Sequence, residues 1–162
     1  MSTIDRTTLI AAFRSGPARL RTAVEGLNAP ILDFRPFDDA WTIRENLVHL
    51  CDAEVYAYAR HRKAIAEPGA RVDVWEETKW HAGLDYGGCD AAAALALYEA
   101  LRLATALLLD RLAGRDWSGC RIEHPVRGTL TLEQLAAFFA EHDNFHLDLI
   151  DRNKRLWKEK KG

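Results

Sequence analysis

The chain has 162 residues, of which 48% are hydrophobic, and its 22 Lys and Arg residues nearly balance its 24 Asp and Glu residues. This length predicts a single domain over residues 1–162 with one hydrophobic core. The net charge of −2 does not favour a nucleic-acid partner. Because no apolar run approaches the roughly 20 residues that span a bilayer, we expect no membrane partner either.

The three cysteines, Cys51, Cys89 and Cys120, show no CxxC spacing, and the first residues do not have the pattern of a signal peptide. We therefore expect reduced thiols and a cytoplasmic location. The alternative for these cysteines is that one of them faces a metal ion.

Four segments repeat hydrophobic residues at alternating steps of three and four, the period of an amphipathic helix. They begin near Ser2–Asp5, Thr42, Asp90 and Thr131, and they end at the LNAP sequence 27–30, about Ala66, Gly114 and about Trp157. Two starts are capping boxes, with Glu45 and Gln134 three residues after the respective threonines. The sequence 15–17, SGP, is expected to kink or interrupt the first helix.

Strand-like alternation is nearly absent, and only residues 120–131 are expected to form a short extended turn. The sequence therefore predicts an all-α protein, a four-helix bundle with long connections. Segments 67–89 and 114–130 are long for such a bundle, and long loops are often functional. A short helix is expected within residues 73–82.

The first long connection is rich in aromatic residues, including Trp75, Trp80 and Tyr86. Aromatic side chains on loops usually pack the loop against the core. The alternative is that these three form the wall or lid of a pocket.

His142 and His146 lie four residues apart in the middle of the apolar stripe of the last helix. Side chains with this spacing lie one above the other, so two imidazole nitrogens can reach one metal ion. A third ligand is needed, and His49 on the second helix is the best candidate, with Asn46 as a small neighbour on the same flank. A metal-free alternative is a buried network in which Asp143 or Asp52 binds the histidines.

Candidates for acid–base or positioning roles near such a site are Glu45, Asp52 and His124. Each also has a simpler interpretation, as a helix cap, a solvated acid and an exposed loop residue respectively. His61 and His81 are not expected to be ligands, and His61 lies in the basic run ARHRK, which is typical of a surface. The HExxH motif of zinc proteases and the paired ExxH motifs of di-iron bundles are absent.

The stretches WTIRENLVHLCDAE, HPVRGTLTLEQL and EHDNFHLDLI resemble the DinB-like superfamily, which includes the YfiT-type metal-dependent hydrolases. The resemblance extends over nearly the whole chain. It implies a four-helix bundle with up-down-down-up connectivity and one divalent ion held by His49, His142 and His146. It also implies a homodimer and, in some relatives, a low-molecular-weight thiol as co-substrate.

Two functions remain open. The first is a metal-dependent hydrolase or thiol S-transferase that acts on a small molecule through zinc or nickel held by the three imidazoles. An ion with an open coordination position makes water or a thiol nucleophilic at neutral pH. The second is a non-catalytic bundle, either a binding module or a structural dimer that the metal stabilises.

Overall fold

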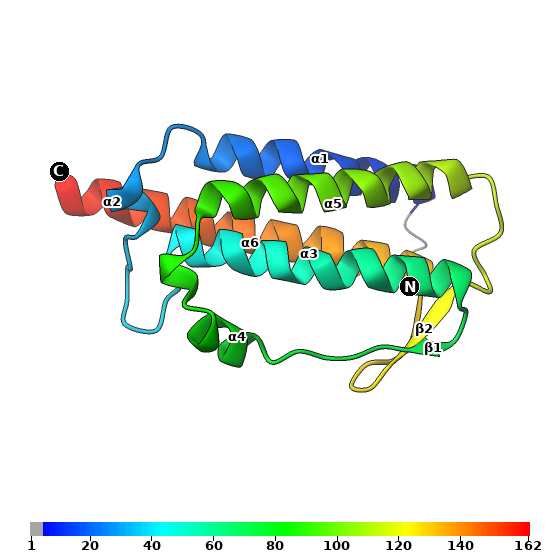
Figure 1. Cartoon of the computed structure of the whole chain (residues 1–162). Helices are drawn as coiled ribbons and strands as arrows, with labels where there is room; N and C mark the ends of the chain where they lie inside the picture. The colour runs from blue at the N-terminus through cyan, green and yellow to red at the C-terminus, as the bar shows by residue number, and fades with distance from the viewer. Residues whose placement is uncertain (1–4) are drawn as a thin grey trace.

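Four long helices pack side by side in the computed structural model, which describes residues 5–162 (Figure 1). They are α1 (Arg6–Val24), α3 (Ile43–Ala66), α5 (Ala91–Leu112) and α6 (Leu132–Lys161). Each helix packs against two others, so that α1, α5, α3 and α6 follow one another around the bundle. The predicted all-α four-helix bundle is confirmed.

The helices run up, down, down and up, as expected. In Figure 1, α1 and α6 run in one direction, and α3 and α5 run in the other. Because α3 and α5 are parallel, the chain between them returns along the outside of the bundle, which explains the length of that connection. It contains β1 (Ala70–Arg71), α4 (Glu77–Gly83) and the 3-10 turn η1 (Tyr86–Gly88), while the short α2 (Ala29–Leu32) connects α1 to α3.

A small sheet covers one end of the bundle. Strands β2 (Arg121–His124) and β3 (Gly128–Thr131) form an antiparallel hairpin, with His124 opposite Gly128. Strand β1 pairs in parallel with β2, with Ala70 opposite Ile122. The extended turn predicted at 120–131 is therefore present, whereas the addition of β1 was not predicted.

The helix starts follow the sequence signals. Both capping boxes form, and Asp90 accepts hydrogen bonds from the first amides of α5. Asp5 caps α1, while the rest of the predicted start, residues 2–4, lies outside the described residues. Two expectations need correction: α1 is uninterrupted through Pro17, and α6 continues to Lys161 instead of ending near Trp157. The short helix expected within residues 73–82 is present and covers Glu77–Gly83.

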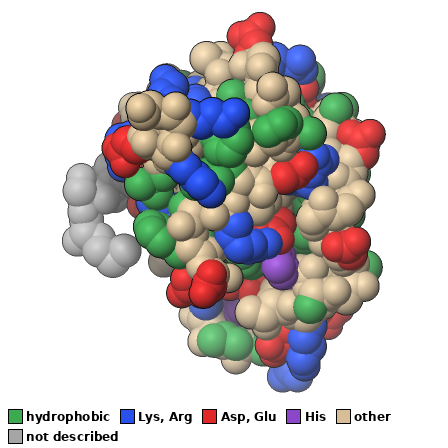
Figure 2. Space-filling model, turned by 90° about the vertical axis from the view of Figure 1, so that its left-hand side faces the viewer, with side chains coloured by type: hydrophobic (Ala, Val, Ile, Leu, Met, Phe, Trp, Pro, Cys, Tyr) green, Lys and Arg blue, Asp and Glu red, His purple; other side chains and the backbone are tan. Residues whose placement is uncertain are grey.

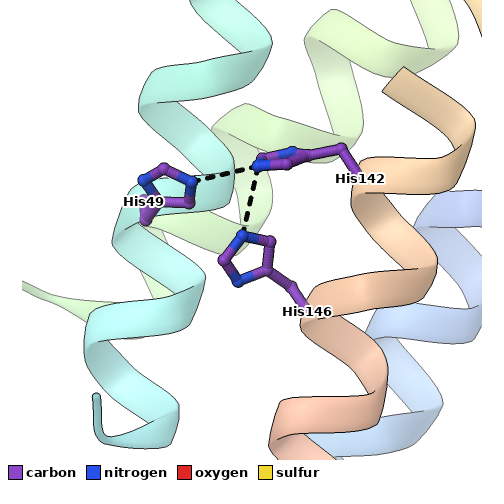
Figure 3. A group of neighbouring side chains, drawn as sticks. All are labelled: His49, His142 and His146. Carbon is purple, nitrogen blue, oxygen red and sulfur yellow. Dashed lines mark hydrogen bonds between the residues drawn. The ribbon is translucent and has the colours of Figure 1, made fainter. Parts of the chain in front are cut away.

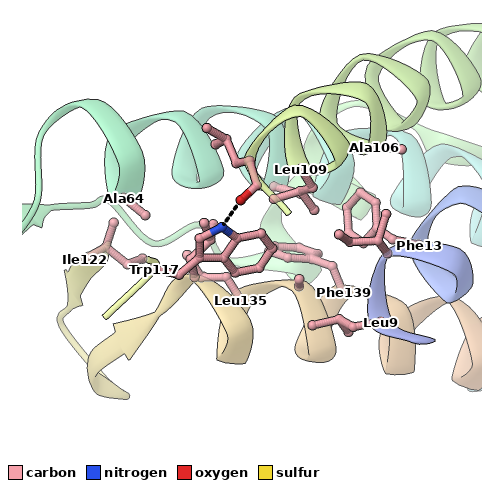
Figure 4. Close-up of a cluster of buried hydrophobic side chains, with 14 of the residues drawn as sticks. Leu9, Phe13, Ala64, Ala106, Leu109, Trp117, Ile122, Leu135 and Phe139 are labelled. Carbon is pink, nitrogen blue, oxygen red and sulfur yellow. Dashed lines mark hydrogen bonds between the residues drawn. The ribbon is translucent and has the colours of Figure 1, made fainter. Parts of the chain in front are cut away.

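The core consists of two hydrophobic clusters. Figure 4 shows the cluster at the sheet end, where α1, α5 and α6 enclose Trp117, whose indole N–H donates to the carbonyl of Leu112 at 2.8 Å. The second cluster lies toward the other end and is formed by the following residues: Leu20, Ile31, Ile43, Leu47, Leu50, Cys51, Ala91, Tyr98, Leu147 and Ile150.

A buried ionic group joins the two clusters. The guanidinium of Arg102 donates to Glu54 and to both oxygens of Asp143, and Tyr98 donates to Asp143 at 2.8 Å. Arg102 lies 4.0 Å from the ring of Phe13 in the first cluster and 5.1 Å from that of Tyr98 in the second. These charges connect α3, α5 and α6 across the bundle interior.

Helix α5 corrects one sequence-based expectation. By length and composition alone, Ala91–Leu112 is apolar enough to cross a membrane. A core helix of a bundle passes the same test. In this fold, Tyr98, Arg102 and Thr105 of α5 are buried inside the bundle, so the finding is weak evidence for a membrane segment.

Candidate metal centre

Three imidazoles from two helices point at one another (Figure 3). The Nε2 atom of His142 lies 3.1 Å from Nε2 of His49 and 3.1 Å from Nε2 of His146. One ligand atom from each ring lies within 4.8 Å of the other two. His49 and His146 are buried and His142 is half-buried, so one member of the cluster reaches solvent.

These distances suit a shared metal ion. A tetrahedral zinc site with metal–nitrogen bonds of about 2.0–2.1 Å separates its ligand nitrogens by about 3.3 Å. No cysteine or carboxylate joins the three rings within residues 5–162, so the cluster offers three nitrogens and leaves a fourth position open. The coordination chemistry is that of a site for a divalent ion.

Asn46 fixes the orientation of one imidazole. Its side-chain amide donates to the carbonyl of Thr42 at 2.7 Å, which turns its oxygen toward His146. Nδ1 of His146 lies 2.7 Å from that oxygen and therefore carries the proton. Nε2 of His146 then presents its lone pair to the cluster, as a metal ligand requires.

Burial keeps all three rings neutral at neutral pH. It lowers the pKa of His49 to about 3, of His142 to about 4 and of His146 to about 2. Electrostatic repulsion lowers these pKa values further: a proton on His142 would disfavour protonation of His49 and His146, and the positive charge of Arg102 disfavours protonation of His142. Neutral imidazole is the form that binds a metal ion.

The described residues do not form the alternative, a metal-free network in which Asp143 or Asp52 binds the histidines. Both oxygens of Asp143 are taken by Arg102, and Tyr98 binds one of them. Asp52 accepts a hydrogen bond from the hydroxyl of Tyr86 at 2.5 Å. Within residues 5–162, neither carboxylate forms a hydrogen bond with a histidine.

Trp41 and His81 form an aromatic layer beside the cluster. Their rings stack at 5.0 Å with an interplanar angle of 3°. The Trp41 ring also meets His49 edge-on at 5.0 Å. Asn153 holds this layer in place, because its amide donates to the carbonyl of Trp41 at 2.8 Å.

Glu45, a candidate base, is already engaged. Its carboxylate accepts from the amide of Thr42 at 2.7 Å and from Arg35 at 2.6 Å, and it lies 3.0 Å from Nε2 of His81. Burial alone would raise the pKa of Glu45, but these hydrogen bonds lower it overall. The helix-cap interpretation therefore describes Glu45 best.

Two cavities meet at the cluster. The larger, of about 810 Å³, lies between α3 and α6 and is lined by His49 and His142. The smaller, of about 560 Å³, is lined by Trp41, His142 and His146. His142 and Glu77 line both, so the cluster can be reached from two sides.

Figure 2 shows the bundle end that lies at the left of Figure 1. On this face, positive and negative side chains are mixed, and no extended basic surface is visible.

The predicted pocket residues have different roles. Trp75 lines the larger cavity and stacks on the ring of His49 at 5.3 Å. Trp80 packs edge-on against Trp75, and Tyr86 is fully buried against Trp41, so these two support the wall without lining either cavity. Asn46 is also buried and positions His146.

The remaining histidines and cysteines require two corrections. His61 is not on the surface: it is fully buried between Phe13 and Phe139, and its Nδ1–H donates to the carbonyl of Ala57 at 2.6 Å. His124 is not exposed: it is buried at the end of β2 and lines the larger cavity outside the three-histidine cluster. The three cysteines are free, and within the described part of the chain none of them belongs to the three-histidine cluster.

Three residues that the structure places at the site were not predicted from the sequence, namely Trp41, Tyr56 and Arg60. A signal existed for two of them. His49, Ala53, Tyr56 and Arg60 are spaced four, three and four residues apart, which puts them on one face of α3. All four line the larger cavity.

The fold and the site together define a helical bundle with an open cluster of three imidazoles. The sequence profile of the DinB superfamily matches residues 12–150, and the chain belongs to this superfamily. Among its relatives, a protein of Geobacillus kaustophilus named "Putative metal-dependent hydrolase GK0616" is 31% identical over 150 residues, which cover 91% of this chain and 84% of the relative.

YfiT of Bacillus subtilis, named in the same way, is 26% identical over 146 residues, which cover 90% of this chain and 82% of YfiT. The solved structure of YfiT matches with a TM-score of 0.86 and covers 96% of this chain and 89% of that one. YfiT is described there as "a probable metal-dependent hydrolase with an unusual four-helix bundle topology".

Proposed function

We propose that the protein is a metal-dependent enzyme, a hydrolase or a thiol S-transferase, that acts on a small molecule. His49, His142 and His146 hold one divalent ion, zinc or nickel, which supplies a Lewis acid with an open position for water or a thiol. The observation that carries this proposal is the three converging nitrogens at the meeting point of two cavities.

The chain's own residues prepare the site in two ways. Asn46 sets the tautomer of His146, and burial keeps the rings neutral and ready to bind the ion. The two cavities that share His142 also give separate approaches to the same ion. This arrangement favours a reaction between two molecules, such as a low-molecular-weight thiol and an electrophile, or water and a larger ester or amide.

The alternative is a non-catalytic bundle that the metal stabilises. It is favoured by the position of the cluster, since His49 and His146 tie α3 to α6 and bury their rings. Under this alternative, chelation lowers the melting temperature but removes no activity. We retain as proposals a cytoplasmic location, a homodimer, and no membrane or nucleic-acid partner for this single domain.

The test begins with protein purified without a polyhistidine tag, because a tag and a nickel column load such sites artificially. Elemental analysis then measures the bound ion, and the metal-loaded protein is assayed against esters, amides and electrophile–thiol pairs. Turnover is expected for the parent protein and lost in His142→Ala. The matched control is Glu141→Ala, which removes the exposed neighbouring side chain of α6.

If the loaded protein is inert in all three panels while chelation still lowers its melting temperature, the catalytic proposal is wrong and the structural alternative holds. Protein that contains no metal and takes none up would exclude both.

A further inference from the structure

Positively charged side chains line the end of the larger cavity that is farthest from the three-histidine cluster. Arg60 of α3 and Arg127 of the β2–β3 turn line it together with His124. Arg60 is 11 residues after His49 on the same face of α3, which corresponds to about 16 Å along the helix axis. The cavity therefore has a metal-site end and a cationic end.

Arg60 is a buried cation with an unsatisfied donor. Only 8% of Arg60 is exposed, and its Nε has no hydrogen-bond partner within the described residues. One of its terminal nitrogens donates to the carbonyl of Asp73 at 2.6 Å. No carboxylate forms a salt bridge with Arg60 or Arg127 within residues 5–162. A buried guanidinium without a counter-ion is costly unless an anion binds it.

His124 adds a neutral donor. The backbone amides of Val126 and Arg127 both donate to its Nδ1 at 3.2 Å. The proton of the neutral ring is therefore on Nε2. Burial and the positive charges of Arg60 and Arg127 lower the pKa of His124, so the ring stays neutral.

The two carboxylates that line the cavity do not neutralise this end. Glu76 and Glu77 are exposed and lie at the start of α4, and Glu77 also lines the smaller cavity next to His142. They therefore belong to the metal end and the rim. Burial lowers the pKa of Arg60, and the positive charge of Arg127 lowers it further, while the nearby Asp73 acts in the opposite direction without reversing the shift.

Between the two ends the walls are apolar and aromatic. Tyr56 and Trp75 stack at 5.5 Å on one side, and Phe138 of α6 lies on the other. The guanidinium of Arg127 covers the ring of Phe138 at 4.5 Å. Such walls suit an elongated ligand with an apolar middle.

We propose that Arg60, Arg127 and His124 form an anion-binding subsite that holds a carboxylate or phosphate group of the substrate. The opposite, reactive end of that substrate lies at the three-histidine cluster. This proposal rests on the proposed function for the identity of the ligand as substrate. The subsite itself is a property of the cavity and can be tested without metal or turnover.

The test measures binding to chelator-treated protein, so that no anion can bind a metal ion. The probes are 4-phenylbutyrate, its neutral amide, and 2-phenylethyl phosphate, titrated by calorimetry and by tryptophan fluorescence at constant ionic strength. We expect the two anions to bind at least about tenfold more tightly than the amide, as charge-assisted hydrogen bonds predict. The anion that binds more tightly identifies the group that the subsite prefers.

Arg60→Gln and Arg127→Gln are each expected to weaken anion binding by about tenfold. The matched control is Arg121→Gln, on the same hairpin but exposed and outside the cavity. If Arg60→Gln loosens the loop that it anchors at Asp73, its melting temperature will reveal this. Arg127→Gln then provides the decisive comparison, because the residue is exposed and its guanidinium, which lies on the ring of Phe138, forms no hydrogen bond or salt bridge within residues 5–162.

The proposal is overturned if the amide binds as tightly as the anions, if none of the probes binds, or if both arginine variants bind like the parent. It is also overturned if the anions bind only after metal is added, since they would then occupy the cluster. An inert enzyme that still binds the anions would refute the proposed catalysis and leave the subsite intact.

Discussion

The imidazole of His146 and the amide of Asn46 are joined across α6 and α3 by a hydrogen bond of 2.7 Å between Nδ1 and Oδ1. Asn46 is itself held in place, because its side-chain nitrogen, Nδ2, donates to the carbonyl of Thr42 at 2.7 Å. The start of α3 therefore determines which nitrogen of His146 faces the other two rings. Thr42 therefore has two roles: its side chain caps α3, and its carbonyl positions Asn46, which orients His146 in the candidate metal centre.

Replacing this partner should weaken metal binding without removing a ligand. We expect Asn46→Leu to lower the affinity for Zn²⁺ by about 10–100-fold, the usual effect of losing a partner that orients a ligand. Asn46→Asp keeps an acceptor for Nδ1–H and should retain most of the affinity. Competition with a chromophoric chelator measures both. Asn144→Leu, at an exposed amide of α6, is the control. Equal affinities for the two leucine variants would show that the hydrogen bond does not matter.

Gly16 permits the close approach of α1 to the buried ionic group. A Cβ atom at this position would lie 2.7 Å from Oδ2 of Asp143 and 3.1 Å from the hydroxyl of Tyr98. Arg102 holds Asp143 in place, so the carboxylate cannot move away. We expect Gly16→Ala to destabilise the protein by about 1–3 kcal/mol, although alanine favours a helix.

Urea unfolding measures this change in the free energy of unfolding. Gly114→Ala is the matched control, because within residues 5–162 only its own chain neighbours would lie within 4 Å of the added methyl group. A Gly16→Ala variant as stable as its parent would mean that α1 shifts away from Asp143 at little cost.

The elements with strong local signals were predictable from the sequence. Thr42 and Thr131 mark helix starts through capping boxes, and the four-residue step from His142 to His146 places both rings on one face of α6. These signals depend on backbone geometry within a few residues. His49 was named as the best third ligand from its place on the second helix, and the resemblance to a known superfamily implied the same three ligands. Its convergence on the pair depends on how α3 packs against α6, which no local signal determines.

The interpretation of the polar residues near the end of α3 as a solvent-exposed surface was wrong. The run ARHRK at 59–63 reads as a surface, yet His61 is fully buried and Arg60 is 8% exposed. Each arginine of the run covers an aromatic ring of its own helix, Arg60 that of Tyr56 and Arg62 that of Tyr58. Charge counts cannot reveal this, because the outcome depends on which helix lies opposite.

The exposed face of α5 is the surface that we propose for the homodimer. Leu97, Leu103 and Leu107 are 48%, 52% and 53% exposed on one side of this helix. Self-association through a two-fold axis would bury them. The double variant Leu103→Glu, Leu107→Glu should therefore be monomeric in analytical ultracentrifugation, while Val55→Glu on α3 should remain dimeric. A parent protein that sediments as a monomer at high micromolar concentration would contradict the homodimer.

The burial of His61 should make stability depend on pH. Burial lowers the pKa of His61 to about 4, whereas an exposed imidazole in the unfolded chain titrates near its ordinary value of 6.5. As the pH falls below about 6.5, the unfolded chain takes up a proton that the folded protein does not, so the free energy of unfolding decreases. The full effect is on the order of 3 kcal/mol and is reached as the pH approaches 4.

His61→Phe removes this titration and keeps a ring between Phe13 and Phe139. The difference in unfolding free energy between variant and parent should therefore shift in favour of the variant as the pH falls from 7 to 4. Urea titrations at each pH measure it, with chelator present so that the three-histidine cluster contributes equally to both proteins. Parallel pH profiles for parent and variant would show that His61 is protonated in the folded state as readily as in the unfolded one. Burial argues against this, because it lowers the pKa of His61 by more than the hydrogen bond to the carbonyl of Ala57 raises it.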